Sequence, residues 1–312
     1  MIGKLGRPAT ILVKAIVAIN VLANLFAWLL TSVYFGILLP PMVVGNATEG
    51  IWDRMVFVLV AFGFVVSIIA PINARRVFPL IREARRRLEP VRSKDRDESE
   101  TDALHRLAGK LLRLPVKLAV TTLLGWLIGA IALLKVPHTF PWIFPWTHEL
   151  SHRMAAWMVF VAAPITVCWV FFSQEHWLRK KMPEFFPAEA LRSVPPTFRI
   201  NVLPKMLVVS LIITTIPVIM VSHVTLHQIQ EIQAGRQSIA VFLDHMPVII
   251  WFLSAVFVVV AAGLSIFMSK SFSEPLKKFE SAMDTIREGH LDVTVPVVSN
   301  DEIGHTAEGF NR

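Results

Sequence analysis

The sequence SKSFSEPLKKFESAMDTIREGHLDVTVPVVSNDEIGHTAEGFNR, residues 269–312, decides how the rest of the chain is interpreted. Apolar residues recur at intervals of three, four and three positions, at Leu276, Phe279, Met283 and Ile286. This spacing predicts one apolar seam along a helix. We expect Pro275 in the first turn of that helix and Gly289 as its C-terminal stop.

A connector and a second short helix are predicted after Gly289. Leu291, Val293 and Val295 alternate with polar residues, and Pro296 prevents this stretch from becoming helical. A second seam runs from Ile303 through Ala307 to Phe310. Two short helices with one narrow apolar stripe each cannot bury those stripes alone, so we expect them to pack against partners.

This helix–connector–helix pattern resembles a HAMP domain, the signal-relay module of bacterial membrane receptors. The residues that carry the resemblance are Pro275, Leu276, Gly289, Leu291, the run Asp301-Glu302-Ile303-Gly304 and the pair Phe310-Asn311. The expected packing residues of the module are Pro275, Leu276, Phe279, Met283, Ile286, Gly289, Leu291, Val293, Glu302, Ile303 and Phe310. Family members form parallel four-helix bundles from two chains, which implies a homodimer. The second helix is truncated relative to the family, so we expect a cytoplasmic output domain beyond Arg312.

The composition indicates an integral membrane protein, because 54% of the residues are apolar and only 17% are charged. The net charge of +8 does not point to nucleic acid, since no basic stretch is interleaved with stacking aromatic residues. The single cysteine, Cys168, lies inside an apolar run and is expected to be a small buried hydrophobic residue.

The predicted fold is an all-α membrane protein, with six transmembrane helices in residues 1–268 and the relay module in residues 269–312. A bilayer core takes about 20 residues to cross. Apolar runs of that size lie near residues 11–39, 52–72, 114–134, 152–173, 204–222 and 247–268.

The connections between these runs predict the orientation. Residues 1–10, 73–113 and 174–203 hold nineteen lysines and arginines, whereas residues 40–51, 135–151 and 223–246 hold two. Basic loops lie in the cytoplasm, so both termini are expected on the cytoplasmic side of a bacterial inner membrane. The basic side chains are expected to contact membrane lipid.

The connections also carry structural expectations. Two apolar periodicities in 73–113 predict helical extensions of the second and third crossings, whereas the proline-rich 174–203 is expected to be an irregular connector. The outward segment 223–246 is helical in pattern up to Gln233 and broken near Gly235. No outward segment is long enough for a separate ligand-binding domain. Any input is therefore expected at the helices themselves or at their outer ends.

Two histidine pairs, His148/His152 and His223/His227, are spaced four residues apart near the outer ends of the fourth and fifth crossings. Such spacing places both imidazoles of a pair on one helix face. Ordinary interfacial hydrogen bonding is one interpretation. A metal ion, a haem or a joint pH-dependent titration is the alternative hypothesis.

Gly125 and Gly129 form a small-xxx-small face that permits close helix packing in the third crossing. No phosphate-binding loop, metal-binding motif or nucleophile elbow is present in the sequence, so no catalytic residue is assigned.

The layout of six helices leading into a HAMP module resembles the membrane half of bacterial class III adenylate cyclases. The run Leu112-Arg113-Leu114-Pro115, followed by residues 124–129, looks like the start of the third helix in that family. The resemblance implies a regulatory region for a cyclase. A histidine kinase or chemotaxis-type output, or a transporter with a regulatory tail, stays open as an alternative.

Overall fold

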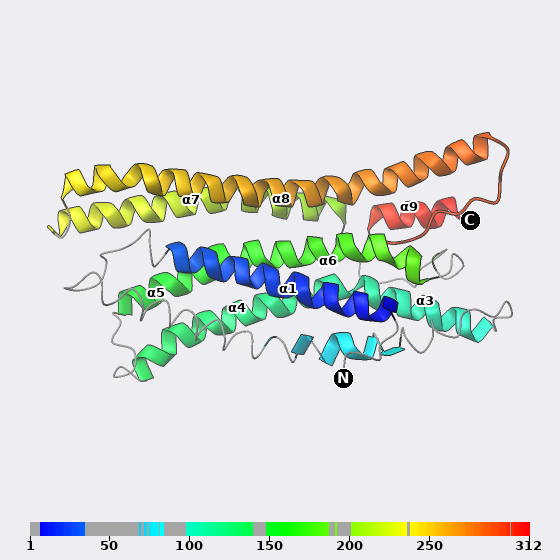
Figure 1. The fold of residues 1–312 in the computed structure, drawn as a ribbon, viewed down its shortest axis with the longest axis horizontal. Helices are drawn as coiled ribbons and strands as arrows, with labels where there is room; N and C mark the ends of the chain where they lie inside the picture. The colour runs from blue at the N-terminus through cyan, green and yellow to red at the C-terminus, as the bar shows by residue number, and fades with distance from the viewer. Residues whose placement is uncertain are drawn as a thin grey trace.

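The computed structural model describes residues 7–34, 98–139, 148–186, 201–235, 238–299 and 301–312, with isolated residues between 69 and 83 and residue 191. All regular elements in these ranges are helices, and they lie largely along one common axis (Figure 1), which confirms the all-α prediction. The helices are α1 (Arg7–Val33), α3 (Glu98–Leu112), α4 (Leu114–Thr139), α5 (His148–Trp157), the π-helix η3 (Met158–Ala162), α6 (Ala163–Phe185), α7 (Val202–Gln233), α8 (Ile239–Arg287) and α9 (Glu302–Phe310).

Four helical stretches among the described residues are long and apolar enough to cross a membrane: Asp102–Lys135, Ser151–Pro183, Val202–Gln233 and Phe242–Arg287. They contain the last four of the six predicted crossings. The first predicted crossing, 11–39, corresponds to α1, whose apolar part is the shorter Ala15–Thr31. The second, 52–72, lies almost wholly outside the described residues.

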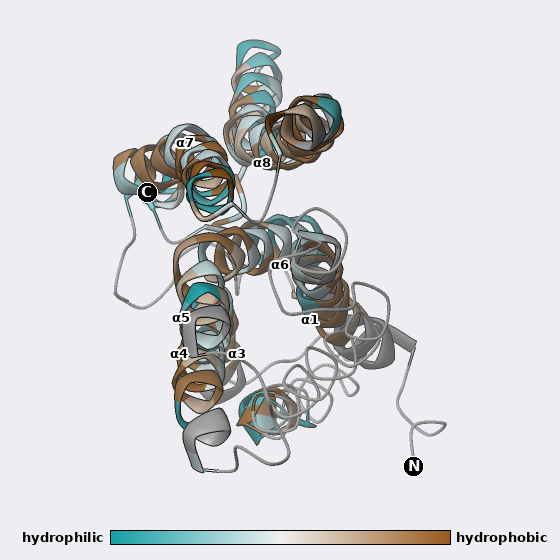
Figure 2. Ribbon diagram, turned by 90° about the vertical axis from the view of Figure 1, so that its left-hand side faces the viewer, coloured by the Kyte–Doolittle hydropathy of each residue, from teal (hydrophilic) through white to brown (hydrophobic). Residues whose placement is uncertain are grey.

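Helix α6 lies at the centre of the bundle and contacts α1, α4, α7 and α8. Figure 2 shows α7 and α8 as a pair on one side of α6, with α1 and α4 on the other side. The outward faces of α7 and α8 are apolar, as at Leu211 (64% exposed) and Trp251 (76% exposed). Apolar surface of this extent facing outward is typical of a helix in contact with lipid.

The prediction of an irregular connector over 174–203 is wrong for its first part, because α6 continues to Phe185. Leu178, Met182 and Phe186 recur every four residues and are buried at 2%, 1% and 5% exposure. This apolar stripe packs against α3 and α4 and keeps the segment helical. Pro183 lies in the last turn, where the helix ends two residues later.

The predicted extension of the third crossing is confirmed in α3, which ends at Leu112 immediately before α4 begins at Leu114. Its apolar residues Leu104, Leu107 and Leu111 are buried. The predicted break after Gln233 is also confirmed, because α7 ends there and Gly235 adopts a φ of 68°.

The expectation that Pro275 lies in the first turn of a helix is wrong. Helix α8 is one uninterrupted element of 49 residues, and Pro275 lies inside it. At about 1.5 Å per residue such a helix is roughly 70 Å long. Its first part contains the predicted sixth crossing, residues 247–268, and its last part is the predicted first helix of the module at residues 269–312. Figure 1 shows the two parts as one continuous helix.

Candidate functional site at the base of the helix bundle

Gly289 ends α8 as predicted. Its φ of 94° lies in the left-handed region that favours glycine. The amide of Gly289 donates to the carbonyl of Ile286 at 2.9 Å, and the amide of His290 donates to the carbonyl of Thr285 at 3.2 Å. These two bonds satisfy carbonyls that the helix end would otherwise leave without a donor.

The connector runs back along the end of α8, and α9 then lies parallel to α8, so that the two helices share a small apolar core (Figure 1). Ala282, Val295, Val297 and Ala307 are buried in it, with Phe279, Val293 and Phe310 packed around them. The rings of Phe279 and Phe310 meet edge to face with centroids 6.0 Å apart. Part of the predicted seam is thus covered within one chain.

Another part of the seam is exposed in the single chain. Leu276, Met283 and Leu291 have exposed fractions of 60%, 56% and 78%. Ile286 and Ile303 are intermediate. The module therefore presents a stripe of large apolar side chains that its own chain leaves uncovered.

Asn311 closes the module by pairing with the backbone of the connector. Its Nδ2 donates to the carbonyl of Val295, and its Oδ1 accepts from the amide of Val295, both at 2.8 Å. The side-chain amide thereby satisfies both backbone groups of an extended residue that has no sheet partner.

Asp301 begins α9 as its N-cap residue. Its Oδ1 accepts from the amide of Gly304 at 3.4 Å and from the hydroxyl of Ser299 at 2.7 Å. The absence of a side chain at Gly304 lets the connector approach, since a Cβ there would lie 2.1 Å from the carbonyl oxygen of Ser299. Two residues of the run Asp301-Glu302-Ile303-Gly304 are thus explained by local structure, because Asp301 caps α9 and Gly304 leaves room for the connector.

Four buried side chains form what we call the charge cluster: Glu175 and Arg179 of α6, Lys205 of α7 and Asp301. The Oδ2 of Asp301 lies 2.7 Å from Nη2 of Arg179 and 2.9 Å from Nζ of Lys205. The Oε1 of Glu175 lies 2.9 Å and 2.6 Å from the same two atoms. Exposed side-chain fractions are 1% for Asp301, 4% for Lys205, 6% for Arg179 and 13% for Glu175. Two cations and two anions balance, which offsets the desolvation of each.

The electrostatics of the cluster keep Asp301 ionised. Burial alone raises the pKa of this carboxyl, but the positive charges of Arg179 and Lys205 and the hydrogen bond from Ser299 outweigh it. The pKa falls from an ordinary 3.8 to about 2.

Arg179 also contacts α8. Pro275 has no amide hydrogen, so the carbonyl of Ser271, four residues earlier, loses its helical donor. Nη1 of Arg179 donates to that carbonyl at 2.6 Å. A side chain from α6 thereby supplies the hydrogen bond that the helix backbone lacks at Pro275.

Two further hydrogen bonds connect the module to the rest of the chain. The Oε2 of Glu302 accepts from the amide of Val202, the first residue of α7, at 2.8 Å. A carboxylate at a helix N-terminus is favourable. The amide of Val297 donates to the carbonyl of Leu191 at 2.8 Å. The adjacent Val298 is buried in the same apolar cluster as Leu178 and Met182.

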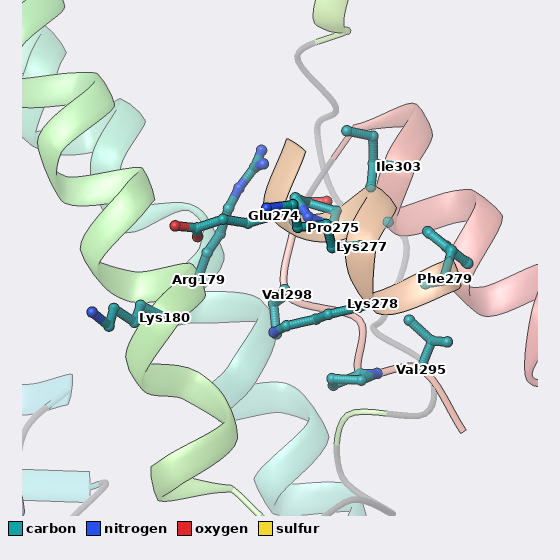
Figure 3. Close-up of a pocket in the computed structure, with 14 residues that line it drawn as sticks. Arg179, Lys180, Glu274, Pro275, Lys277, Lys278, Phe279, Val295, Val298 and Ile303 are labelled. Carbon is teal, nitrogen blue, oxygen red and sulfur yellow. The ribbon is translucent and has the colours of Figure 1, made fainter. Parts of the chain in front are cut away.

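A cavity of about 430 Å³ lies between α6, α8 and the connector with α9 (Figure 3). Figure 3 shows Arg179 of α6 beside Glu274 and Pro275 of α8, while Lys180 extends away from the module. The basic residues that line it are Arg179, Lys180, Lys277 and Lys278.

The predicted outer histidines have protein partners where their side chains are described. Nδ1 of His223 lies 2.7 Å from the hydroxyl of Tyr34 in the chain segment after α1, and Nδ1 of His227 is hydrogen-bonded to Arg153 of α5. His152 is exposed on α5, and the side chain of His148 lies outside the described residues. Among described side chains, no group of three metal-ligating residues comes together. The metal, haem or pH hypothesis stays a prediction, which metal analysis of the purified protein would test.

Gly125 and Gly129 are both buried in α4.

The sequence interpretation missed the charge cluster. A signal was available, because Lys205 stands in the first turn of an apolar helix and Glu175 and Arg179 are four residues apart. A lysine in such a setting requires a partner.

Residues 267–312 match the family model of the HAMP domain. The comparisons with curated proteins and with solved structures gave no match to the chain. The HAMP prediction is thereby confirmed for the module. The match supports a signal-transduction relay in a membrane-embedded receptor.

Proposed function

From the HAMP match at residues 267–312, we propose that the chain is the sensing and signal-relay region of a homodimeric receptor in a bacterial inner membrane. Residues 1–268 form the membrane region, both termini lie in the cytoplasm, and residues 269–312 pass the signal to a cytoplasmic output domain. The charge distribution of the connections supports this orientation.

The observation that carries the proposal is the continuity of α8. One helix includes the apolar crossing and the first helix of the HAMP module, with no break between Ile239 and Arg287. A shift, tilt or rotation of the crossing is therefore delivered directly to Phe279 and the rest of the seam. A packed helical bundle has discrete arrangements, so a small displacement can select between two outputs.

We propose an adenylate cyclase as the output. The six-run layout and the Leu112–Pro115 motif support this, by resemblance to the membrane half of class III cyclases. A histidine kinase or a chemotaxis-type signalling helix is the alternative, because HAMP modules by themselves do not determine the output.

The test uses the chain in membranes with a cyclase catalytic domain fused after Arg312 as reporter. Leu276→Asp with Met283→Asp places charges on the exposed seam, and we expect loss of the dimer and a several-fold change in cyclic AMP production. The matched control is Lys277→Asp with Ser281→Asp, because both residues are exposed on the same helix beside the seam. Unchanged oligomeric state and unchanged output in the seam variant would refute the proposal.

A further inference from the structure

We infer that the membrane region controls the HAMP module at a second point besides α8: helices α6 and α7 hold the start of α9 through the charge cluster. Movement of α6 and α7 relative to α8 is thereby converted into movement of α9 relative to α8. This inference rests on the proposed relay function and adds a separate input to it.

The two helices form an incomplete site that Asp301 completes. Glu175, Arg179 and Lys205 contribute two positive charges and one negative charge, all at 13% side-chain exposure or less. Without Asp301 one cation remains buried and uncompensated, which is costly in a low-dielectric setting. The carboxylate of the module supplies the missing charge at 2.7 Å and 2.9 Å.

The bound carboxylate is also the cap of α9. Oδ2 of Asp301 contacts Arg179 and Lys205, while Oδ1 accepts from the amide of Gly304 in the first turn. A displacement of the two cations therefore acts on the first turn of α9 with no flexible segment between. The hydrogen bond from the amide of Val202 to the carboxylate of Glu302 is a second contact between α7 and the same turn of α9.

Arg179 also contacts α8. One guanidinium donates to Glu175 in its own helix, to Asp301 at the start of α9 and to the carbonyl of Ser271 in α8. The last acceptor is available because Pro275 supplies no amide hydrogen to it. One planar, multi-donor side chain thus contacts α6, α8 and the start of α9 at once, so a movement of α6 along α8 changes the position of the cap of α9.

The first experiment measures whether the cluster holds α9. The full chain, with Cys168→Ala, carries spin labels at Thr306 and Lys180 in one sample and at Thr306 and Glu280 in another, in nanodiscs with excess unlabelled chain. All three label sites are exposed. In Asp301→Asn we expect the α9–α6 distance distribution to lose its single narrow peak. An unchanged distribution would overturn the inference.

A second variant covers the case in which a lone buried charge prevents folding. Lys205→Met with Asp301→Asn removes one charge of each sign, and asparagine is a good N-cap, so folding and capping are kept. The same loss of the α9–α6 peak is expected at an unchanged unfolding temperature. A retained peak in this folded double variant would equally overturn the inference.

The second experiment measures coupling. Gly263 of α8 faces Trp169 of α6, and a Cβ at that position would lie 2.6 Å from the indole ring, so in Gly263→Leu either the ring or the spacing between the two helices has to change. We expect this change to shift the α9–α8 distance in the parent chain and to shift it by less than half as much in the Lys205→Met, Asp301→Asn background. Equal shifts would mean that the cluster is only a structural anchor.

The two proposals fail in distinguishable ways. If the seam variants alter the cyclase reporter but the cluster variants change neither distances nor coupling, only the second input is refuted. If the seam variants alter nothing, the relay function itself is refuted.

Discussion

Of the glycines in the relay module, Gly304 has the least room for a side chain. Gly304→Ala places a methyl group 2.1 Å from a backbone oxygen of Ser299, which cannot swing aside as a side chain would. We expect the connector to move and the stability to fall by about 1–3 kcal/mol, the usual cost of overpacking. Thermal unfolding of the purified full chain would measure this.

Gly309 is the matched control on the same helix. A Cβ there meets nothing within 4 Å, and alanine is the better helix former by about 1 kcal/mol. Gly309→Ala is therefore expected to be neutral or stabilising. If both variants unfold at the same temperature, the close approach at Gly304 has no energetic role.

The pKa of Asp301 predicts an acid-sensitive contact. A carboxyl whose pKa is lowered on docking, here from 3.8 to about 2, stabilises the docked state above pH 4. That contribution is lost as the pH falls from about 4 to about 2, because the protonated acid no longer pairs with Arg179 and Lys205. The α9–α6 spin-label distance, followed from pH 6 to pH 2, should change in this window.

Asp301→Asn tests whether this step belongs to Asp301. Asparagine does not ionise, so the variant is expected to show the open distance at every pH, with no step between 4 and 2. A step of the same size in the variant would assign the transition to another carboxyl.

At the scale of elements, the C-terminal part of α6 depends on the stripe formed by Leu178, Met182 and Phe186. Met182→Ala removes a side chain that is 1% exposed, and we expect a loss of about 2–5 kcal/mol. Amide hydrogen exchange of residues 174–186 would rise accordingly. Lys180→Ala, at an exposed position in the same turn, should change stability by about 0.5 kcal/mol or less. Equal exchange in the two variants would contradict the importance of the stripe.

Sequence periodicity predicted the elements whose causes are local. The Gly289 stop, the break at Gly235 and the α3 seam all depend on residues within one or two turns, and all are observed. The α6 extension was equally local, with apolar residues four apart. The four prolines in 174–203 argue against a helix, but Pro183 lies in the last turn of α6 and the other three follow the end of the helix.

Distant contacts account for what the sequence did not reveal. Pro275 indicates a helix start only if no other donor reaches the carbonyl of Ser271, and that donor, Arg179, is 92 residues away in the sequence. The partners of Asp301 are 96 and 122 residues away. No periodicity or motif connects residues at such separations, so the sequence signals that Lys205 needs a partner, but only the structure shows that Asp301 is one of its partners.

At the scale of the whole molecule, the proposed dimer accounts for the exposed stripe of the HAMP module. Leu276 and Met283 are more than half exposed in one chain, although the spacing along α8 is that of a buried seam. Large apolar side chains that remain exposed along a seam are typical of an interface. The proposed dimer would complete the core that Phe279 and Ala307 begin within each chain.

A parallel two-fold bundle brings identical seam positions of two chains face to face, and this gives the last prediction. In a Cys168→Ala background, Met283→Cys should form a disulfide between chains in native membranes under mild oxidation. Glu280→Cys, exposed on the same helix but off the seam, should form several-fold less. Non-reducing electrophoresis measures both. Equal cross-linking at the two positions would mean random collision, and the exposed stripe would then have to face something other than a second copy of α8.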